Sequence, residues 1–147
     1  MGIDWSPDYK SSTRQGLVNM TVVEERNKLK AMFLMQEAFM KRLANADESF
    51  PKWPLDITKK KSQQECRDLA FNSMGELFEA VQELKNSKKH RQTEIPEFDR
   101  QKFVEELVDA FKYFLEILIF VGVSPQEFFD AYCEKDAIIN KRIDDSY

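Results

Sequence analysis

Two pairs of acidic residues have the spacing of a metal-binding site. Glu76 and Glu79 lie three residues apart, and Glu106 and Asp109 repeat that spacing further along the chain. Side chains three residues apart share one face of a helix, so each pair can point in one direction. If the two helices pack together, the carboxylates converge, and such a concentration of negative charge needs a compensating cation. Oxygen ligands of this kind favour Mg2+, with Mn2+ as the alternative.

The position of each acid relative to the apolar residues decides which packing of the two helices would make one site. Each acid comes one residue before an apolar position, as in Glu79-Ala80 and Asp109-Ala110. The acidic side chains are therefore rotated by about 100° in the same sense from the apolar side chains on both helices. Equal offsets fall on the same side of an antiparallel pair, so antiparallel packing makes one acidic site. The alternative is that 26 acidic residues in 147 produce such spacings by chance on solvated faces.

The composition favours a helical domain. Of the 147 residues, 42% are hydrophobic and twelve are phenylalanines, which is enough to build a core. Only four glycines and five prolines are present, which favours helices over a turn-rich β fold. We therefore expect an all-α fold, a bundle of four to five helices. It forms a single domain over residues 21–147, after an irregular arm over residues 1–20.

Charge and cysteine content exclude several classes of function. The 22 basic and 26 acidic residues leave a net charge of −4, so no basic field favours binding to duplex nucleic acid. Cys66 and Cys133 lie in no CxxC motif and the chain has one histidine, so neither a zinc site nor a disulfide framework is indicated. Residues 1–10 lack the apolar run of a signal peptide, and the longest apolar run, residues 117–123, is too short to span a bilayer. We expect a cytoplasmic protein that does not enter a membrane.

Capping signals and apolar spacing predict four helices. The first extends from a capping box at Thr21 to residue 44, and the second from a capping box at Ser62 to residue 85. The third extends from residue 99 to Gly122, and the fourth from Ser124 to residue 142. Residues 111–121 are apolar almost all round, apart from three polar side chains, so we expect them to reach a subunit interface. The protein is therefore expected to be a homodimer or a larger homo-oligomer.

Two side chains outside the acidic pairs are candidates for ligand binding. Gln36 is the polar residue in the apolar stripe of the first helix, so its amide is either satisfied in the core or faces a ligand. Trp53 lies in a proline-rich loop, where its ring either meets a ligand or covers the edge of the core.

The connector after the second helix is basic. It contains Lys88, Lys89 and Arg91, which either stabilise the C-terminus of that helix or meet phosphates beside the acidic site. Glu83 extends the acidic stripe by one helical turn and is a candidate for an additional metal ligand.

These motifs resemble those of the all-α nucleoside triphosphate pyrophosphatases, whose signature is ExxE on one helix and ExxD on the next. Within that superfamily of MazG-like proteins, the chain is most similar to the dimeric dUTPases and the T-even-phage type of dCTP/dUTP pyrophosphatase. The similarity covers residues 32–147 and is patchy over 50–65 and 86–100. It rests on Met35-Gln36 with Arg42-Leu-Ala-Asn45, on Glu106-Leu-Val-Asp109-Ala-Phe-Lys-Tyr-Phe114 ahead of Gly122, and on Lys135, Arg142 and Tyr147.

The resemblance implies a Mg2+-dependent enzyme that cleaves dUTP or dCTP to the monophosphate and pyrophosphate, in the cytoplasm or in the host cytoplasm if a phage encodes it. Glu76, Glu79, Glu106 and Asp109 would hold the metal, and Glu76 or Glu79 would accept a proton from water. The phosphates would meet Lys88, Lys89, Arg91, Lys135 and Arg142, and the base would meet Gln36, Phe39, Trp53 and Asn140.

One position departs from the family pattern. The family places an asparagine four residues after the lysine of the last helix, where this chain has Ile139, and Asn140 follows it. A shift of one residue turns a helical side chain by about 100°, so Asn140 would reach a nucleotide only through a local adjustment.

Two other functions stay open at this point. One is a broader MazG-like house-cleaning pyrophosphatase that accepts purines or modified bases. The other is a helical interaction protein without catalysis, against which the presence of all four acids argues. An amide can present a donor and an acceptor in either orientation, so Gln36 does not choose between uracil and cytosine.

Overall fold

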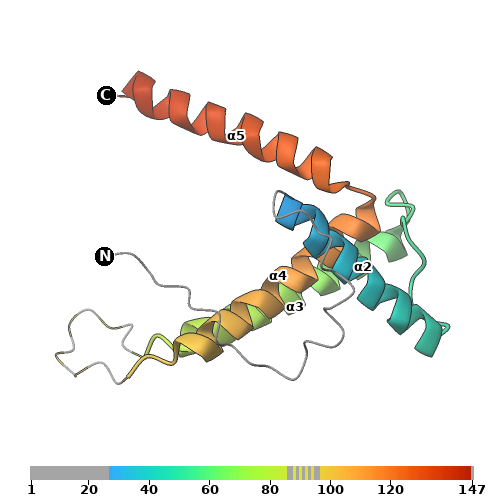
Figure 1. Ribbon diagram of the computed structural model, residues 1–147, viewed down its shortest axis with the longest axis horizontal. Coiled ribbons are helices and arrows are strands. Elements are labelled where there is room, and N and C mark those ends of the chain that lie inside the picture. The colour runs from blue at the N-terminus through green and yellow to red at the C-terminus, as the bar shows by residue number, and fades with distance from the viewer. Residues whose placement is uncertain are drawn as a thin grey trace.

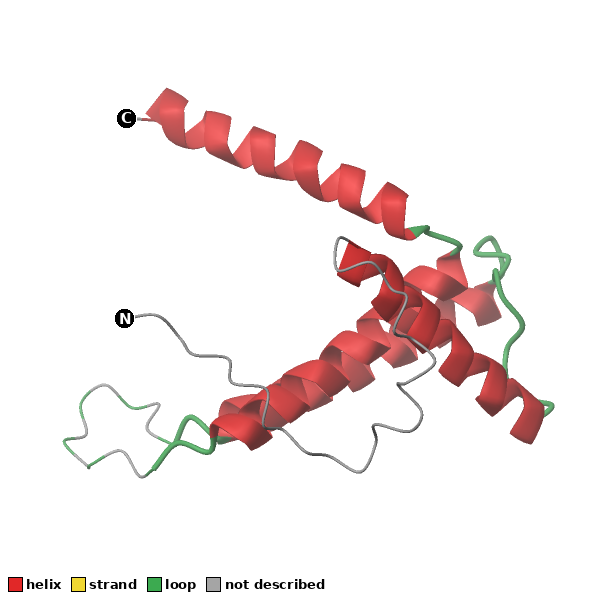
Figure 2. Cartoon of the chain, viewed as in Figure 1, coloured by secondary structure: helices red, strands yellow, loops and turns green. Residues whose placement is uncertain are grey.

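The computed structural model describes residues 27–85, 88, 90, 92, 94 and 97–146. Within them the chain forms four helices and no strand, α2 (Lys28–Ala46), α3 (Lys60–Gln82), α4 (Arg100–Val121) and α5 (Pro125–Ser146) (Figure 2). The predicted all-α class is therefore confirmed. No helix among these four is long and apolar enough to cross a membrane.

The helices α3 and α4 form an antiparallel pair, and α2 crosses the end of that pair (Figure 1). The Ser73 hydroxyl on α3 donates a 2.8 Å hydrogen bond to the carbonyl oxygen of Ala110. Further along α3 the pairing reaches Lys102, whose ammonium lies 2.9 Å from the carboxylate of Glu83. Residue numbers rise on one helix as they fall on the other, so the pair has the antiparallel packing that the offsets of the acids require for one site.

The fourth helix does not complete the expected bundle. In the described part of the chain, α5 approaches α2, and its Phe128 ring meets Phe114 of α4 with centroids 5.7 Å apart. The rest of α5 runs away from α3 and α4 (Figure 1). Phe128 in its first turn packs against the core, whereas residues 129–145 are all exposed. Three helices therefore surround the core of one chain, and α5 leaves its apolar side chains uncovered by the described residues.

The ends of α4 and α5 follow the predicted signals. The Asp99 carboxylate accepts a hydrogen bond from the backbone N–H of Lys102 at 3.0 Å, which caps the start of α4. At its other end Gly122 adopts the left-handed conformation at φ 83°, and the N–H of Val123 donates to the carbonyl oxygen of Leu118 at 2.9 Å. The Ser124 hydroxyl then accepts from the N–H of Glu127 at 3.1 Å, so α5 starts as expected and ends four residues later than the predicted residue 142.

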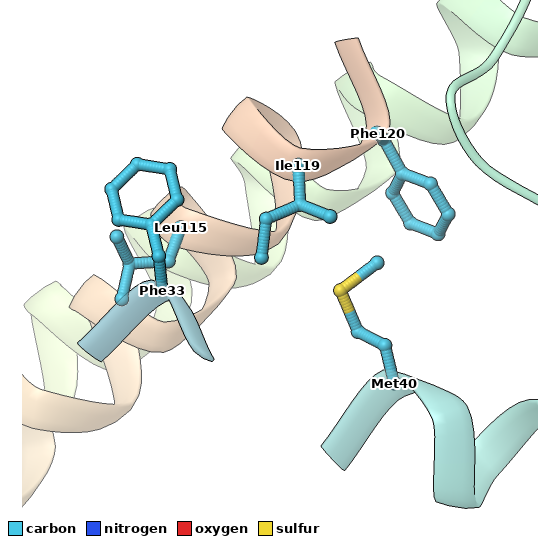
Figure 3. Packing of buried hydrophobic residues seen from close by; sticks show 5 residues of the cluster. All are labelled: Phe33, Met40, Leu115, Ile119 and Phe120. Atoms are coloured by element: carbon cyan, nitrogen blue, oxygen red, sulfur yellow. The ribbon is translucent and has the colours of Figure 1, made fainter. Parts of the chain in front are cut away.

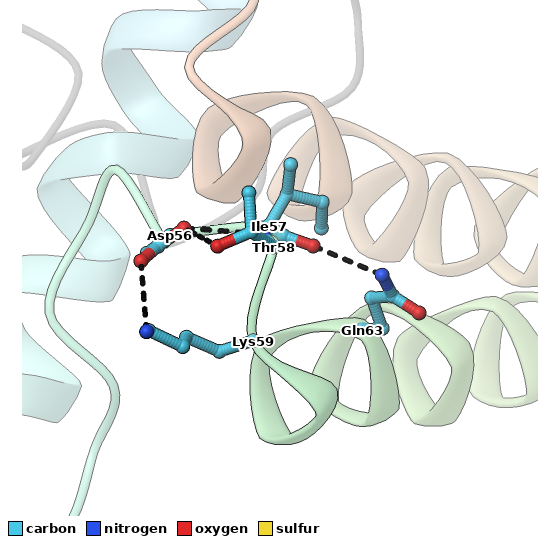
Figure 4. A network of polar contacts seen from close by, with 5 residues as sticks. All are labelled: Asp56, Ile57, Thr58, Lys59 and Gln63. Atoms are coloured by element: carbon cyan, nitrogen blue, oxygen red, sulfur yellow. Dashed lines mark hydrogen bonds and ion pairs between the residues drawn. The ribbon is translucent and has the colours of Figure 1, made fainter.

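The predicted start of the second helix is wrong. Ser62 lies inside α3, which starts at Lys60 without a side-chain cap. A turn at Asp56 leads the chain into the helix instead, because its carboxylate accepts hydrogen bonds from the N–H and hydroxyl of Thr58 (Figure 4). The amide of Gln63 also donates to the Ile57 carbonyl oxygen at 3.0 Å.

The first helix starts later than predicted in the described part of the chain. Asn27 caps α2, since its side-chain oxygen accepts from the N–H of Lys30 at 3.1 Å. The capping box predicted at Thr21–Glu24 lies outside the described residues. The helix ends at Ala46, two residues beyond the predicted end.

The core lies where α2 crosses α4. Phe33 and Met40 of α2 point toward Leu115, Ile119 and Phe120 of α4, and all five are buried (Figure 3). The loop after α2 is joined to this core by the N–H of Leu55, which donates a 2.7 Å hydrogen bond to the carbonyl oxygen of Phe120. The core therefore sets the position of α2 against the C-terminal half of α4.

Candidate metal centre and adjoining pocket

The acidic residues of α3 and α4 gather on one side of the helix pair. One carboxylate oxygen from each of Glu76, Glu79 and Glu106 lies within 4.8 Å of the other two. Asp109 lies near enough for its charge to raise the pKa of Glu76. We call these four residues the acidic cluster. The structure thus brings together the carboxylates that the offset pattern predicted would converge, and the metal itself stays a prediction.

Burial and like charge both raise the pKa of Glu76 above its ordinary value. Burial is the largest cause, and the charges of the other three members of the acidic cluster add to it. A carboxyl with a raised pKa holds its proton more readily in the folded chain than in the unfolded chain. The cluster therefore destabilises the metal-free fold increasingly as the pH rises through that pKa. A divalent cation bound by these oxygens would relieve the repulsion, so the donor set fits Mg2+.

Glu83 extends the acidic face by one turn but is already neutralised. Its side chain is 7% exposed, and its carboxylate lies 2.9 Å from the Lys102 ammonium and 3.7 Å from that of Lys85. The hydrogen bond from Lys102 holds the pKa of Glu83 below its usual range. The ion pairs of the described α3 and α4 thus gather at Glu83 rather than at the acidic cluster, and the structure offers no support for Glu83 as an additional metal ligand.

A pocket of about 370 Å³ opens beside the acidic cluster, between α2 and the α3–α4 pair. It joins the acids to two of the residues that the resemblance assigns to base binding. The lining consists of Glu76 and Asp109, of Gln36, Phe39 and Leu43 on α2, and of Lys112, Tyr113 and Glu116 on α4.

The amide of Gln36 is held at both ends by charged side chains of α4. Its Nε2 donates to the Glu116 carboxylate at 3.3 Å, and its Oε1 accepts from the Lys112 ammonium at 3.0 Å. The same ammonium lies 5.0 Å from the centre of the Phe39 ring. Gln36 is only 2% exposed and its amide is satisfied within the chain, which is the first of the two alternatives. It also lines the pocket, and a contact with a ligand stays a prediction.

Glu116 is a buried carboxylate in this network. Burial raises the pKa of Glu116, while the hydrogen bond from Gln36 and the charge of Lys112 act in the opposite direction. The side chain is 6% exposed, so its contacts with Gln36 and Lys112 compensate for lost hydration.

Trp53 lies away from the pocket. Its ring packs edge-on against Phe120 with centroids 6.2 Å apart, and its indole N–H donates to the Glu37 carboxylate at 3.4 Å. The structure therefore favours the alternative that Trp53 covers the edge of the core, and it does not support a contact between Trp53 and a base in this pocket.

The candidate residues on α5 are not brought to the acidic cluster within one chain. Lys135, Asn140 and Arg142 are exposed on the part of α5 that runs away from the described α3 and α4 (Figure 1). The Asn140 amide donates to the Asp136 carboxylate at 2.9 Å, a contact within α5. These residues can serve the site only if a second copy of the chain places its α5 there.

The basic connector gives little support for phosphate binding. Lys88 lies between the ends of α3 and α4 and does not line the pocket beside the acids. Lys89 and Arg91 lie outside the described residues.

Three polar residues of the pocket were not among the sequence-based candidates. Lys112, Tyr113 and Glu116 are the polar residues that interrupt the apolar segment 111–121. They follow Asp109 by three, four and seven residues, which is the spacing of one helix face. That spacing was the signal that could have joined them to the acidic cluster.

The chain matches no protein-family model, no curated protein and no solved structure. The chemistry of the site therefore has to be inferred from the acidic cluster, the pocket and the motifs of the sequence.

The repulsion within the acidic cluster leads to a prediction for the metal-free protein. We expect Glu79→Gln to raise the melting temperature in EDTA at neutral pH, because it removes a charge that faces Glu76. The gain should shrink as the pH falls through the raised pKa of Glu76, since protonation relieves the same repulsion in the wild type. Thermal melts from pH 4 to 8, with and without Mg2+, measure both effects.

Glu105→Gln is the matched control, because Glu105 is exposed on α4 and its carboxylate accepts a hydrogen bond from Gln101. It should leave the melting temperature nearly unchanged and should keep the stabilisation by Mg2+ that Glu79→Gln weakens. An equal response of the two variants to pH and Mg2+ would contradict a cation site at the cluster.

Proposed function

We propose that this protein is a Mg2+-dependent pyrophosphatase that cleaves a deoxypyrimidine triphosphate, dUTP or dCTP, to the monophosphate and pyrophosphate. The observation that carries the proposal is the single pocket that joins Glu76 and Asp109 of the acidic cluster to Gln36 and Phe39. A nucleotide needs a cation site for its phosphates and an amide or a ring for its base, and these lie side by side here.

The acids account for the chemistry of the reaction. Bound Mg2+ would neutralise the charge of the phosphates and make the attacking water more acidic. Glu76 or Glu79 would accept the proton of that water, and Glu76 is the better placed because it lines the pocket. Lys112 adds a cation to the pocket, where it can meet the negative charge of the phosphates.

Two alternatives have a different basis. A broader pyrophosphatase would use the same acids and would accept purines as well. A helical interaction protein without catalysis is favoured by the apolar side chains that the described chain leaves exposed on α3, α4 and α5.

Turnover decides among these functions. We expect pyrophosphate release from dUTP or dCTP in the presence of Mg2+ and none in EDTA, because the uncompensated acids would repel the phosphates. Glu79→Ala and Asp109→Ala should each abolish release while the helical content measured by circular dichroism is kept. Pyrophosphate release from the eight common ribo- and deoxyribonucleoside triphosphates is the measurement, and turnover in EDTA or in either variant would refute the mechanism.

Gln36 tests base recognition. Replacing Gln36 by Leu leaves the polar edge of a bound pyrimidine unpaired, which costs about 1–3 kcal/mol per group. We expect kcat/KM for dUTP and dCTP to fall roughly ten-fold to more than a hundred-fold, with the metal dependence kept. The melting temperature should also fall, because the variant leaves Glu116 and Lys112 without their shared partner. A change in melting temperature with unchanged kinetics would mean that Gln36 is only a core amide.

The face of the α3–α4 pair opposite to the acidic cluster is apolar and exposed. Glu79 and Val81 lie on either side of the buried Ala80 in the sequence. Two residues correspond to a turn of about 200° on a helix, so the side chains of Glu79 and Val81 lie on opposite sides of α3. We define the apolar face by the exposed side chains of Met74, Phe78 and Val81 on α3 and of Val104, Val108 and Phe111 on α4.

We propose that a second copy of the chain covers the apolar face. Phe78 is 64% exposed, and α5 adds Tyr132 at 66% and Ile143 at 52%. Soluble monomers rarely expose contiguous apolar surfaces of this kind, and closed homodimers are the commonest way to cover them. A dimer would also give α5 a partner that its own chain does not supply.

Sedimentation tests the assembly. We expect the wild-type chain to sediment as a dimer or a larger oligomer at micromolar concentration, and Phe78→Lys to shift it toward the monomer, because a charge would be buried in the interface. Gln64→Lys, at an exposed position nearer the start of the same helix, is the control and should keep the wild-type assembly. A monomeric wild type would refute the assembly without affecting the proposed reaction of the acidic cluster.

A further inference from the structure

We propose that Lys112 is a latch that occupies the base-reading side chains until phosphate draws it away, so that phosphate binding and base binding are coupled. This inference rests on the proposed function, because it takes the pocket beside the acidic cluster to be the nucleotide site. It adds a role for a lysine that neither the motifs nor the spacing of the acids had assigned.

One ammonium group holds both candidate base contacts in the described structure. The Lys112 Nζ donates to Gln36 Oε1 at 3.0 Å and lies 5.0 Å from the centre of the Phe39 ring. A pyrimidine that hydrogen-bonds to Gln36 Oε1 and stacks on the Phe39 ring would compete with the Lys112 ammonium for both contacts. The base-reading side chains are therefore engaged by the protein itself.

The contacts that hold Lys112 are weaker than those that a phosphate would offer. An amide oxygen is a neutral acceptor, and a cation over an exposed ring gains little. Glu116 attracts Lys112 as well, but its carboxylate also accepts the Nε2 hydrogen of Gln36. In a contact between an ammonium and a phosphate oxygen both partners are charged, so the attraction exceeds that of the same ammonium for a neutral amide oxygen.

Lys112 lies where the exchange is feasible. It lines the same pocket as Glu76 and Asp109, and it follows Asp109 by three residues on the same face of α4. Its side chain is flexible and only half-buried, so it can turn from Gln36 toward phosphates held at the acidic cluster.

The exchange would leave Gln36 oriented and available. Glu116 keeps its hydrogen bond to Nε2, so the amide stays in one orientation when Oε1 is released. The Phe39 ring is uncovered in the same movement. The phosphates of a triphosphate therefore free Gln36 and Phe39 for the base. A nucleoside has no phosphate to attract Lys112, so the free energy of displacing the ammonium lowers its affinity.

Lys112→Met should change the affinity for nucleosides and the affinity for triphosphates in opposite directions. We expect the variant to bind deoxyuridine and deoxycytidine roughly two- to ten-fold more tightly than the wild type, because nothing has to be displaced from Gln36. It should bind the α,β-imido analogues of dUTP and dCTP roughly ten-fold or more weakly in Mg2+, because a phosphate contact is lost. Isothermal titration of these four ligands measures both changes.

Two further variants complete the comparison. Lys112→Arg keeps the cation and should keep the wild-type order, with weak nucleoside and tight triphosphate binding. Lys41→Met removes an exposed lysine of α2 that pairs with Glu37, 3.2 Å away and outside the pocket, and should change neither affinity.

The wild-type protein offers a test that does not depend on the folding of any variant. Inorganic pyrophosphate with Mg2+ should occupy Lys112 and tighten deoxyuridine binding several-fold, and the reciprocal effect should be equal in size. Absence of this coupling, or a Lys112→Met variant that weakens nucleoside and triphosphate alike, would refute the latch. If the wild type releases pyrophosphate from dUTP or dCTP, such a result leaves the proposed function standing. If the wild type neither hydrolyses nor binds these nucleotides, both inferences fail.

Discussion

The close approach of α3 and α4 through small residues holds the site together. Ala80 is completely buried and Ala110 is 8% exposed, and the Ser73 hydroxyl bonds to the Ala110 carbonyl oxygen across the gap. Because an acid precedes each alanine by one residue, this packing forces like charges together on one side of the pair. The packing of the helices has to offset that repulsion, so the acidic cluster destabilises the fold that forms it.

The position of α2 turns this acidic surface into a pocket. Phe33 and Met40 dock on the C-terminal half of α4, and the residue between them on the same face, Gln36, then meets Glu116 and Lys112. Burying charged groups is unfavourable unless they are paired and hydrogen-bonded, and the Gln36 amide satisfies both of them. The packing of α2 on α4 therefore forms the hydrophobic core and the polar network together, and it places Gln36 and Phe39 in the same pocket as Glu76 and Asp109.

Local signals predicted the helices well where a single short stretch determines the end. Asp99, Gly122 and Ser124 act on backbone groups within a few residues, and the structure places all three as expected. Ser62 carries a similar signal, which predicts the wrong start for the second helix. The turn at Asp56 comes first in the chain, and α3 already begins at Lys60. A capping motif shows only that a helix can start at that residue. Whether the helix has already started depends on the preceding segment.

The helix period and the offset of each acid from its apolar stripe are enough to predict that Glu76, Glu79 and Glu106 converge if the two helices pack antiparallel. The contacts of Gln36 with Lys112 and Glu116, of Glu83 with Lys102 and of Trp53 with Phe120 could be known from the packed helices and not from the sequence. These contacts join segments whose separation in space depends on how α2 crosses the pair, and on the loop that connects α2 to α3. The periodicity within one helix does not predict how α2 crosses the α3–α4 pair, because the crossing depends on how the surfaces of different helices fit together.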